Sequence, residues 1–228
     1  MFSDTPQHIL IEQRATILFR LTAAGRMVCV NEPGDPPAPN LYICRSQHGL
    51  RCWFHVDLPD ALCAEIRAIC AAEPPSANLE TPPHCRAQLR ALLAEPADEW
   101  RGPCFTFPAA LPPAPDVVLL DAADAERLRP TFGAPPPTYW PIAAIFHGDQ
   151  AVAICGSSRR TPFACEAGAD TLRTARGRGY AVQTVSAWAQ AMRAEGCTPL
   201  YSTAWDNEAS RAVAHKLGLI CYAEDWSL

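Results

Sequence analysis

The stretch Arg176-Gly177-Arg178-Gly179-Tyr180-Ala181 decides how the C-terminal half of this 228-residue chain folds. It follows a β-like run at residues 163–172, and after it apolar side chains recur at helical spacing as far as Met192. A strand therefore gives way to a helix, whose N-terminal N–H groups and dipole favour an anion. Arginines add a basic patch around the turn: Arg159, Arg160, Arg173, Arg176 and Arg178. This combination favours a phosphorylated ligand; a glycine-capped surface turn with solvated arginines is the alternative.

Two widespread phosphate-binding loops do not fit this stretch. The three-glycine fingerprint of a Rossmann dinucleotide fold is incomplete, and the upstream strands look like a meander rather than a parallel sheet. A Walker loop is excluded because its Gly-Lys-Ser/Thr ending is absent. The turn therefore predicts a phosphate cradle of another kind.

The segments before the turn predict an antiparallel meander. Two β-like runs, at residues 139–146 and 150–155, are joined by His147-Gly148-Asp149, whose Gly-Asp pair suits a tight hairpin. A polar loop at residues 157–161 leads into the third run, at 163–172. Ahead of the meander we expect a short buried strand and a short helix, at residues 116–120 and 122–128.

The segments after the turn predict alternating helices and strands. The first helix ends at Glu195-Gly196, where glycine suits a left-handed cap. It is followed by a strand, a helix closed by Gly218 and a last strand, at residues 199–203, 207–217 and 219–223.

Proline clusters mark loops elsewhere in the chain, at residues 33–39, 74–83, 108–115 and 135–141. The N-terminal part predicts one helix and three strands, at residues 7–21, 27–30, 41–44 and 52–56. Asp57-Leu58-Pro59-Asp60 is expected to cap a helix that reaches residue 72, and another helix covers 85–94. These elements form a small α/β unit of ordinary domain size. We therefore divide the chain into residues 1–114 and 115–228.

Two blocks of the C-terminal half carry a recognisable pattern. The first is Arg176-x-x-Gly179-x-Ala181, and the second is Asn207-x-x-Ser210 followed by Lys216-Leu217-Gly218-Leu219. Both are similar to signatures of the GNAT-type N-acyltransferases, in the right order and structural context, and the resemblance covers about residues 139–228. It implies an α/β (α+β) fold with a mixed, mostly antiparallel sheet flanked by helices, preceded here by the small N-terminal α/β domain.

The resemblance also implies a cosubstrate, acetyl-CoA, held in a V-shaped opening between the strands at 163–172 and 199–203. Pantetheine would pair with the backbone of the first strand, at Ala169, Asp170 and Thr171. The pyrophosphate would lie on the turn, at Arg176, Gly177, Arg178, Gly179, Tyr180, Ala181 and Val182. Asn207 matches a residue that commonly contacts the cofactor arm.

The implied reaction is direct transfer of an acetyl group from the thioester to an amine, which needs a base for the amine and an acid for the leaving thiolate. Glu166 is the candidate base, because it is the only carboxylate in the middle of an apolar strand; a structural carboxylate is the alternative. Asp170 is a second candidate. The family's frequent acid, a Tyr seven residues after the Asn, is replaced by Ala214, which leaves Ser210, Tyr201 or water.

Two functions therefore compete. The first is an N-acetyltransferase for a small-molecule or protein amine, with the N-terminal unit covering or shaping the acceptor pocket. The second, suggested by Ala214, is a non-catalytic acyl-CoA sensor or interaction module. The segment between Leu120 and Tyr139 is short for the two helices usual before the hairpin, and a final strand beyond residue 223 is not evident. Either the N-terminal unit or a partner chain, as in a homodimer, would supply these pieces.

The eleven cysteines do not indicate a disulfide scaffold, because they are odd in number and lie mostly in apolar runs. They predict buried thiols in a reducing compartment. Cys44, His48, Cys52 and His55 could ligate zinc, but their spacing departs from the usual paired forms. A hairpin that turns at His48-Gly49 is the simpler interpretation, so no metal is expected.

The net charge of −5 argues against wholesale nucleic-acid binding, because no excess of Lys and Arg can neutralise phosphates. No apolar stretch approaches the ~20 residues that cross a bilayer, and the first residues lack the features of a secretory signal. We expect a cytoplasmic protein that binds neither nucleic acid nor membranes.

Overall fold

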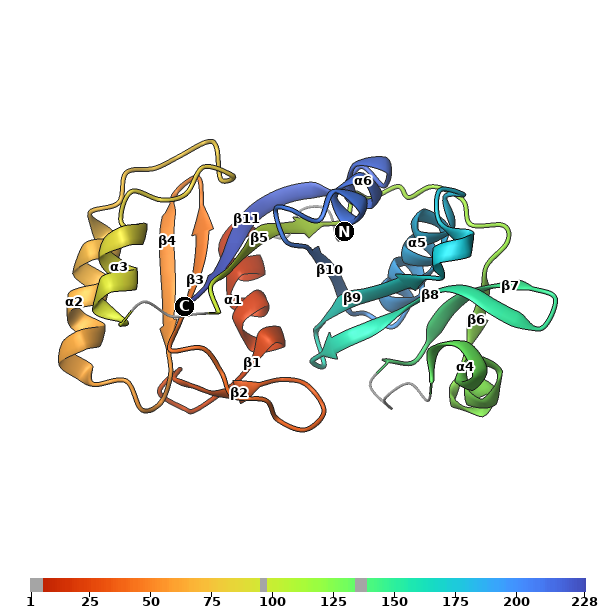
Figure 1. Ribbon diagram of the computed structural model, residues 1–228, viewed down its shortest axis with the longest axis horizontal. Coiled ribbons are helices and arrows are strands. Elements are labelled where there is room, and N and C mark those ends of the chain that lie inside the picture. Colours follow the sequence, from red (N-terminus) through yellow and green to blue (C-terminus); the bar gives the residue numbers. More distant parts are fainter. Residues whose placement is uncertain (1–5, 95–97, 134–138) are drawn as a thin grey trace. The chain divides into compact units, whose positions relative to one another are not determined.

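The computed structural model describes residues 6–94, 98–133 and 139–228 (Figure 1). The chain forms two compact units. The central unit, named for its place in the sequence, comprises Thr106–Tyr201 and Ala209–Ile220, and the terminal unit comprises Pro6–Phe105, Ser202–Glu208 and Cys221–Leu228. The sequence pattern suggested one cut between residues 114 and 115, whereas each unit gathers separate segments. The first five residues and residues 134–138 of a predicted proline loop lie outside the described parts.

The described part of the central unit contains a sheet in the strand order β10-β9-β8-β7-β6. These strands are β6 Val118–Leu120, β7 Ile142–His147, β8 Gln150–Arg160, β9 Ala164–Thr171 and β10 Thr198–Ser202. Strands β6 to β9 pair antiparallel, which confirms the predicted meander and its hairpin, and β10 runs parallel to β9. The sheet is therefore mixed and mostly antiparallel, as predicted.

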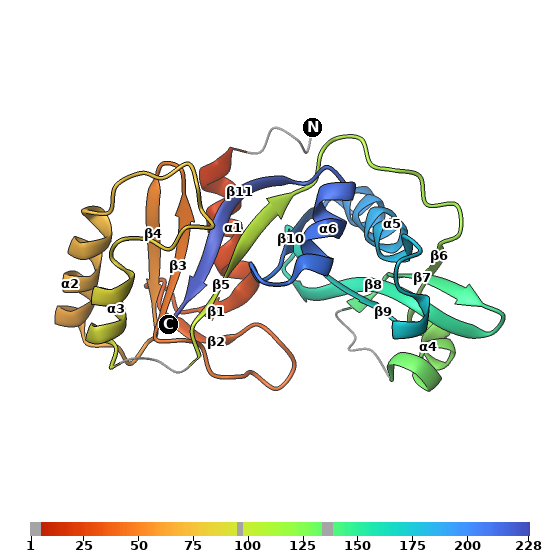
Figure 2. The same cartoon turned by 45° about the horizontal axis from the view of Figure 1, so that its top comes forward.

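Helices α4 and α5 lie on opposite faces of these strands (Figures 1 and 2). Helix α5 (Tyr180–Ala194) follows the short turn η3 (Arg173–Ala175) and buries Trp188 and Met192. Helix α4 (Ala125–Phe132), which follows η1 (Ala122–Asp124), buries Leu128 among apolar side chains of β6, β7 and β8. Helix α6 (Glu208–Lys216) follows β10. The positive φ angles of Gly196 and Gly218, 79° and 65°, confirm the glycine ends predicted for α5 and α6.

Strand β8 continues through residues 157–160, where the sequence predicted a loop, and that prediction is wrong. A bulge between Ser157 and Arg159 shifts its register against β9. Ser157 is buried and accepts a hydrogen bond from Trp188 Nε1 at 3.2 Å, and Arg160 donates to Glu195 Oε2 at 2.6 Å. These polar side chains have partners on α5 and at its end, so they can occupy a strand despite their loop-like sequence.

The terminal unit contains a sheet in the order β4-β3-β11-β5 and a separate β1-β2 ribbon. Its elements are α1 Gln7–Leu18, β1 Phe19–Leu21, β2 Met27–Val30, β3 Leu41–Ser46, β4 Gly49–Phe54, α2 Asp60–Ala71, α3 Arg86–Leu92, β5 Trp100–Thr106 and β11 Ile220–Ser227. One apolar core joins α2 and α3 to β3, β4 and β11 through Leu41, Ile66, Leu89 and Trp226. Because β11 pairs antiparallel with β3, it runs well beyond the predicted end at residue 223.

Two further predictions in the terminal unit are wrong, and one strand was not predicted, each for a local reason. The first helix ends at Leu18 rather than residue 21, because Phe19 is extended and starts β1. Pro59 occupies the N-cap of α2 without a side-chain cap, so the expected capping by Asp57 or Asp60 is not seen. Strand β5 had no sequence signal, because Gly102 and Pro103 interrupt the β pattern. None of the described helices is long and apolar enough to span a membrane.

Candidate functional site

The turn between β9 and α5 depends on two glycines. Arg176 is extended, whereas Gly177 and Gly179 both have φ of +79°. Side chains disfavour this left-handed conformation. A Cβ on either glycine would meet no atom within 4 Å beyond the adjacent residues. The glycines are therefore needed for the bend, and the space over the turn is open.

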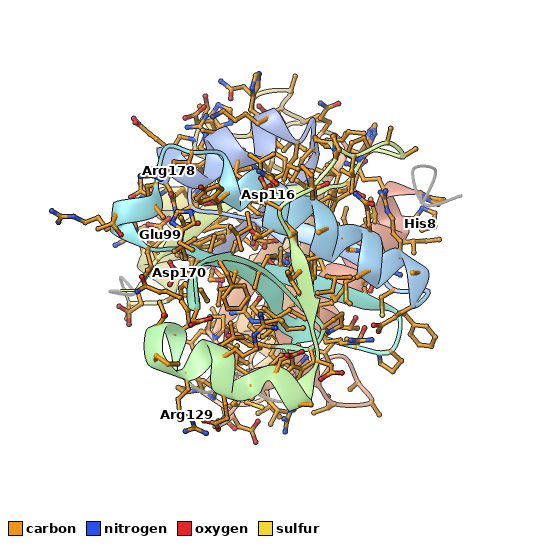
Figure 3. All side chains as sticks on the ribbon, turned by 90° about the vertical axis from the view of Figure 1, so that its right-hand side faces the viewer. His8, Glu99, Asp116, Arg129, Asp170 and Arg178 are labelled. Carbon is orange, nitrogen blue, oxygen red and sulfur yellow. The ribbon has the colours of Figure 1, made fainter. Side chains whose placement is uncertain are left out.

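Helix α5 directs its N-terminal backbone donors at this open turn. Gly179 is the N-cap, and no side chain of the described residues caps the helix. The N–H groups of a first helical turn have no partner within the helix, and the dipole adds a partial positive charge. Arg173 and Arg178 are exposed nearby (Figure 3 labels Arg178). Arg176 is exposed as well, and its Nε donates to the Thr171 carbonyl at 3.2 Å. This arrangement suits a phosphate group.

Two side-chain contacts that sequence reasoning missed hold the first turn of α5. The Tyr180 hydroxyl lies 2.9 Å from His147 Nε2, and the two rings meet edge to face. Gln183 Nε2 donates to Asp116 Oδ2 at 3.1 Å, and the Asp116 N–H donates back to Gln183 Oε1 at 3.4 Å (Figure 3 labels Asp116). The partners are 33 and 67 residues apart, so no local pattern could have shown these contacts.

Strands β9 and β10 stop pairing after a short ladder. Residues 164–166 pair with residues 198–200, and in the described chain the ladder does not continue along β9. The predicted pantetheine residues Ala169, Asp170 and Thr171 lie beyond this point and pair with β8 on the other side. Ala169 and Asp170 are exposed, and Asp170 Oδ1 accepts a hydrogen bond from the N–H of Thr171 at 2.7 Å. The predicted opening requires this divergence of the two strands.

Glu166 is buried, with 3% of its surface exposed, on the paired part of β9. The face toward which it points follows from strand alternation. Ser157 accepts from Trp188 of α5 and lies opposite Ala167, so Ala167 faces α5 and the adjacent Glu166 faces the other side. Arg159 is its register partner on β8. The structure thus buries a carboxylate in the sheet, opposite a cation.

The structure brings together the two hydroxyl candidates for the acid. The Tyr201 hydroxyl lies 2.5 Å from Ser210 Oγ and also donates to the Ser210 carbonyl at 3.3 Å. Burial raises the pKa of Tyr201, the hydrogen bond from Ser210 opposes this, and the neighbouring Cys155 adds to the rise. Tyr201 is therefore a protonated phenol at neutral pH. Ala214 is buried, 1% exposed, on α6, so this helix offers no hydroxyl at the position of the family's Tyr.

Asn207 precedes α6 in the segment Ser202–Glu208 of the terminal unit. The residue is exposed, and its backbone N–H donates to the Ala204 carbonyl at 3.1 Å. Its predicted contact with a cofactor stays a prediction.

The cysteines of the central sheet are poor nucleophiles. Burial raises the pKa of both Cys155 and Cys165. The neighbouring Cys165 adds to the rise of the pKa of Cys155, and Cys197 adds to that of Cys165, so both stay thiols at neutral pH. This agrees with the interpretation of the cysteines as buried apolar residues. An acyl-enzyme on either sulfur is therefore disfavoured.

Three of the four possible zinc ligands, Cys44, His48 and Cys52, lie on the β3–β4 hairpin of the terminal unit, and His55 follows β4. The hairpin pairs Ser46 with Gly49 at its turn, and it carries Cys44 and Cys52 on its two strands, as predicted. Within the described residues, no group of three or more His, Cys, Asp or Glu side chains is placed to hold a metal ion.

The chain is similar to several known proteins. A family model described as an acetyltransferase (GNAT) domain matches residues 112–220. A GNAT-family structure from Novosphingobium aromaticivorans DSM 12444 is 20% identical with a TM-score of 0.48, over 57% of this chain and 64% of that one, just under two thirds of its length. A GNAT-family acetyltransferase from Colwellia psychrerythraea is 11% identical with a TM-score of 0.47, over 98% and 97%. A GCN5-related N-acetyltransferase-like protein from Streptococcus suis 89/1591 is 14% identical with a TM-score of 0.47, over 83% and 84%. No curated protein matches the sequence.

Proposed function

Because a family model described as an acetyltransferase (GNAT) domain matches residues 112–220, we propose that the protein is an acetyl-CoA-dependent N-acetyltransferase. It moves the acetyl group directly from the thioester to an amine of a small molecule or a protein. The observation that carries the proposal is the divergence of β9 and β10 beside the open N-terminus of α5. The strand edge suits pantetheine, and the helix N-terminus suits the pyrophosphate.

In this proposal the amides of residues 177–182 donate to the pyrophosphate, and Arg176 and Arg178 add positive charge. The contacts of Tyr180 with His147 and of Gln183 with Asp116 support this role, because they fix the first turn of α5 without a ligand. A site that is already ordered loses less conformational freedom when its ligand binds.

The proposed acid is the hydroxyl pair of Tyr201 and Ser210. Its short hydrogen bond and the raised pKa of Tyr201 support this role, because a protonated phenol can deliver a proton to a leaving thiolate and recover it through Ser210. Glu166 is the proposed base for the amine. Acetyl-CoA supplies the thioester, and the chain orients it and moves the protons.

A non-catalytic acyl-CoA sensor is the second candidate function. The observation that favours it is Ala214, which replaces the family's Tyr and is buried on α6. A sensor would keep the glycine turn and the strand edge and would lack an efficient acid.

The two functions differ in turnover. We would incubate the protein with acetyl-CoA and a thiol reagent across a panel of small amines and peptide amines, and measure CoA binding separately by calorimetry. An enzyme-only control subtracts the protein's own thiols, among them the exposed Cys221. We expect amine-dependent release of CoA and an acetylated acceptor by mass spectrometry. Tight CoA binding without turnover would favour the sensor, and the absence of CoA binding would contradict both.

The remaining parts of the proposal extend the sequence predictions. We propose a cytoplasmic enzyme without nucleic-acid or membrane partners, in keeping with its net charge of −5. A homodimer, and a role of residues 1–114 in shaping the acceptor pocket, stay predictions. Size-exclusion chromatography with light scattering would test the oligomeric state.

A further inference from the structure

A hollow of about 350 Å³ lies on the terminal unit between β4 and α2, and none of its lining residues is assigned to acetyl transfer. Its lining combines two cations, two thiols and two apolar side chains: Leu50, Arg51, Cys52, Arg67, Cys70 and Ala71. We call this feature the thiol hollow. Strand β4 supplies one wall and the last two turns of α2 supply the other.

The thiols at this hollow form a hydrogen-bonded chain. Cys70 bonds to Cys52 on one side and to Cys85 on the other. The bond to Cys52 and burial raise the pKa of Cys70 to about 12, against the opposing effect of Cys85. The bond to Cys70, burial and the adjacent Glu73 raise the pKa of Cys85 further. Cys52, Cys70 and Cys85 therefore form one cluster of thiols, of which Cys52 and Cys70 line the hollow.

Access distinguishes Cys52 from the other two thiols. Cys52 is half-buried at the hollow, whereas Cys70, which also lines it, is buried, and Cys85 is buried and is not among the lining residues. Two arginines lie at the rim. The Arg67 guanidinium stacks 4.7 Å from the centre of the Phe54 ring, and Arg51 pairs with Glu12 at 2.5 Å, which offsets part of its charge. Nearby guanidinium groups stabilise a thiolate, and a small polar oxidant fits a hollow of this volume.

We propose that Cys52 and Cys70 are a peroxide-responsive pair, in which Cys52 reacts with a hydroperoxide and Cys70 closes a reversible disulfide with it. The proposal rests on the thiol cluster, the hollow and the two arginines at its rim, and it does not depend on the acetyltransferase activity.

The chemistry balances with a hydroperoxide as the oxidant. The Cys52 thiolate attacks the terminal peroxide oxygen, an S–O bond forms, the O–O bond breaks, and the leaving alkoxide or hydroxide takes up a proton. The Cys70 sulfur then attacks the Cys52 sulfenic acid. An S–S bond forms, the S–O bond breaks, and hydroxide leaves as water with the Cys70 proton. Two thiols lose two electrons, and the peroxide becomes an alcohol, or water, plus a second water.

The central unit contains a matched internal control. Cys165 also hydrogen-bonds to a second thiol, Cys197, but these residues are 0% and 1% exposed. The pairs Cys165–Cys197 and Cys52–Cys70 therefore share a thiol–thiol contact. They differ in access, because Cys52 and Cys70 line a hollow.

The test uses the reduced full-length chain and hydrogen peroxide at a small molar excess, followed by alkylation and peptide mapping without reductant. We expect loss of two hydrogens and one linked peptide pair, Cys52 with Cys70, which dithiothreitol reverses. Cys52→Ser should abolish the linked peptide pair and the loss of two hydrogens, and leave Cys70 a free thiol. Cys70→Ser, with Cys70→Ala as a second variant, should leave a Cys52 sulfenic acid that dimedone traps. Cys221→Ser should change none of this.

Several outcomes would overturn the proposal. One is a Cys165–Cys197 link formed as fast as the Cys52–Cys70 link. Another is oxidation of Cys52 to a sulfinate with no link while Cys70 stays a free thiol. A third is an undiminished loss of two hydrogens in Cys52→Ser, which would place the reactive thiols elsewhere. Circular dichroism of each variant verifies that the fold is retained, so a negative result counts against the chemistry.

Discussion

The two units differ in how far selected polar groups are exposed. At the turn before α5, backbone donors face open space, and Gly177 and Gly179 carry no side chain to cover them. In the terminal unit, Arg14 and Asp225 are enclosed, with 2% and 1% of their side chains exposed and 2.6 Å between Arg14 Nη2 and Asp225 Oδ2. Open donors at a helix end can accept an anionic ligand, whereas enclosed charges must satisfy each other. The first region is therefore suited to binding an anion, and the second stabilises the terminal unit.

Further hydrogen bonds surround the buried ion pair of Arg14 and Asp225. Tyr42 donates to Asp225 Oδ1 at 2.5 Å, and Arg14 also donates to Ser202 Oγ at 2.7 Å. Burial raises the pKa of Tyr42 and the Asp225 charge adds to this, so the phenol stays a donor. Every atom of this network comes from the terminal unit, although Arg14 and Asp225 are 211 residues apart.

A second network has the same character. Glu224 accepts hydrogen bonds from Arg101 and from Trp205 Nε1, the latter at 2.7 Å, and forms an ion pair with Arg45, whose Nε lies 2.8 Å from Glu224 Oε2. These residues come from β3, β5, β11 and the segment after β10. Together the networks explain why the terminal unit includes Ser202–Glu208 and Cys221–Leu228, since those segments carry the partners of its buried charges.

The largest effect that we expect follows from Asp225→Ala. The change leaves the Arg14 guanidinium buried without its carboxylate, which costs about 3–5 kcal/mol of unfolding free energy. Urea denaturation followed by fluorescence measures the loss. Glu12→Ala is the matched control, because it removes an exposed pair with Arg51 from the same helix, α1. That variant should lose less than about 1 kcal/mol. Equal losses in the two variants would contradict the contrast between enclosed and open charges.

Gly179→Asp tests the open region. A carboxylate at this N-cap would face the pyrophosphate and remove the electrostatic advantage of the helix end, so we expect CoA affinity to fall about 100-fold, or ~2.7 kcal/mol. Isothermal titration calorimetry measures the affinity.

Gly196→Asp is the control for that variant. Gly196 also has φ of +79°, a Cβ there also meets no atom within 4 Å, and it follows the opposite end of the same helix. Both variants therefore carry the same backbone strain, about 1 kcal/mol or somewhat more. CoA affinity should survive in Gly196→Asp, and an equal loss in both would show that strain rather than charge is responsible.

The variant Glu166→Gln tests whether the buried carboxylate of Glu166 acts as a catalytic base or stabilises the central unit. If Glu166 is the base, kcat should fall about 100-fold while CoA affinity changes little, because Gln keeps the shape and loses the proton acceptor. Asp170→Asn, on the exposed part of β9, should change kcat far less. Normal rates across pH together with lower stability would assign Glu166 a structural role opposite Arg159.

The sequence predicted the central unit well because its signals are local. The glycine turn, the hairpin at residues 147–149 and the helix ends at Gly196 and Gly218 are each encoded by adjacent residues, and the structure confirms them. The hydroxyl pair of Tyr201 and Ser210 was named as two separate candidates, and only the packing of α6 beside β10 shows that they bond to each other.

The terminal unit was harder to predict because its determinants are distant in the sequence. No periodicity links Arg101 to Glu224 across 123 residues. Strand β5 lacks a strand pattern because it needs glycine at residue 102, where a Cβ would come within 1.8 Å of the Thr203 carbonyl oxygen. In the central unit, the contacts of His147 with Tyr180 and of Asp116 with Gln183 were not predicted for the same reason. Long-range polar pairs leave no local signature.

The smallest effect that we expect, and the one that depends on pH, follows from Glu99→Gln. Glu99 accepts from Arg86 Nη2 and from Arg90 Nη1, both at 2.6 Å, and from Trp226 Nε1 at 3.0 Å. The hydrogen bonds from Arg86 lead the effects that lower the pKa of Glu99, those from Arg90 add to them, and partial burial opposes them. Gln keeps an acceptor for Trp226 and loses the charge, so we expect a loss of about 1–2 kcal/mol at pH 7.

The direction of the pH dependence follows from the lowered pKa. A carboxyl whose pKa is lower in the folded state contributes its full stabilisation above the unfolded pKa, about 4.3, and loses it as pH falls through the folded pKa. The stability gap between the wild type and Glu99→Gln should therefore close as denaturation is repeated at lower pH. Glu126→Gln is the control, because its pair with Arg129 is exposed and should leave stability unchanged within error. A gap that stays constant into acid would mean that Glu99 acts through its shape and hydrogen bonds, and that its charge is not one of those that hold the terminal unit together.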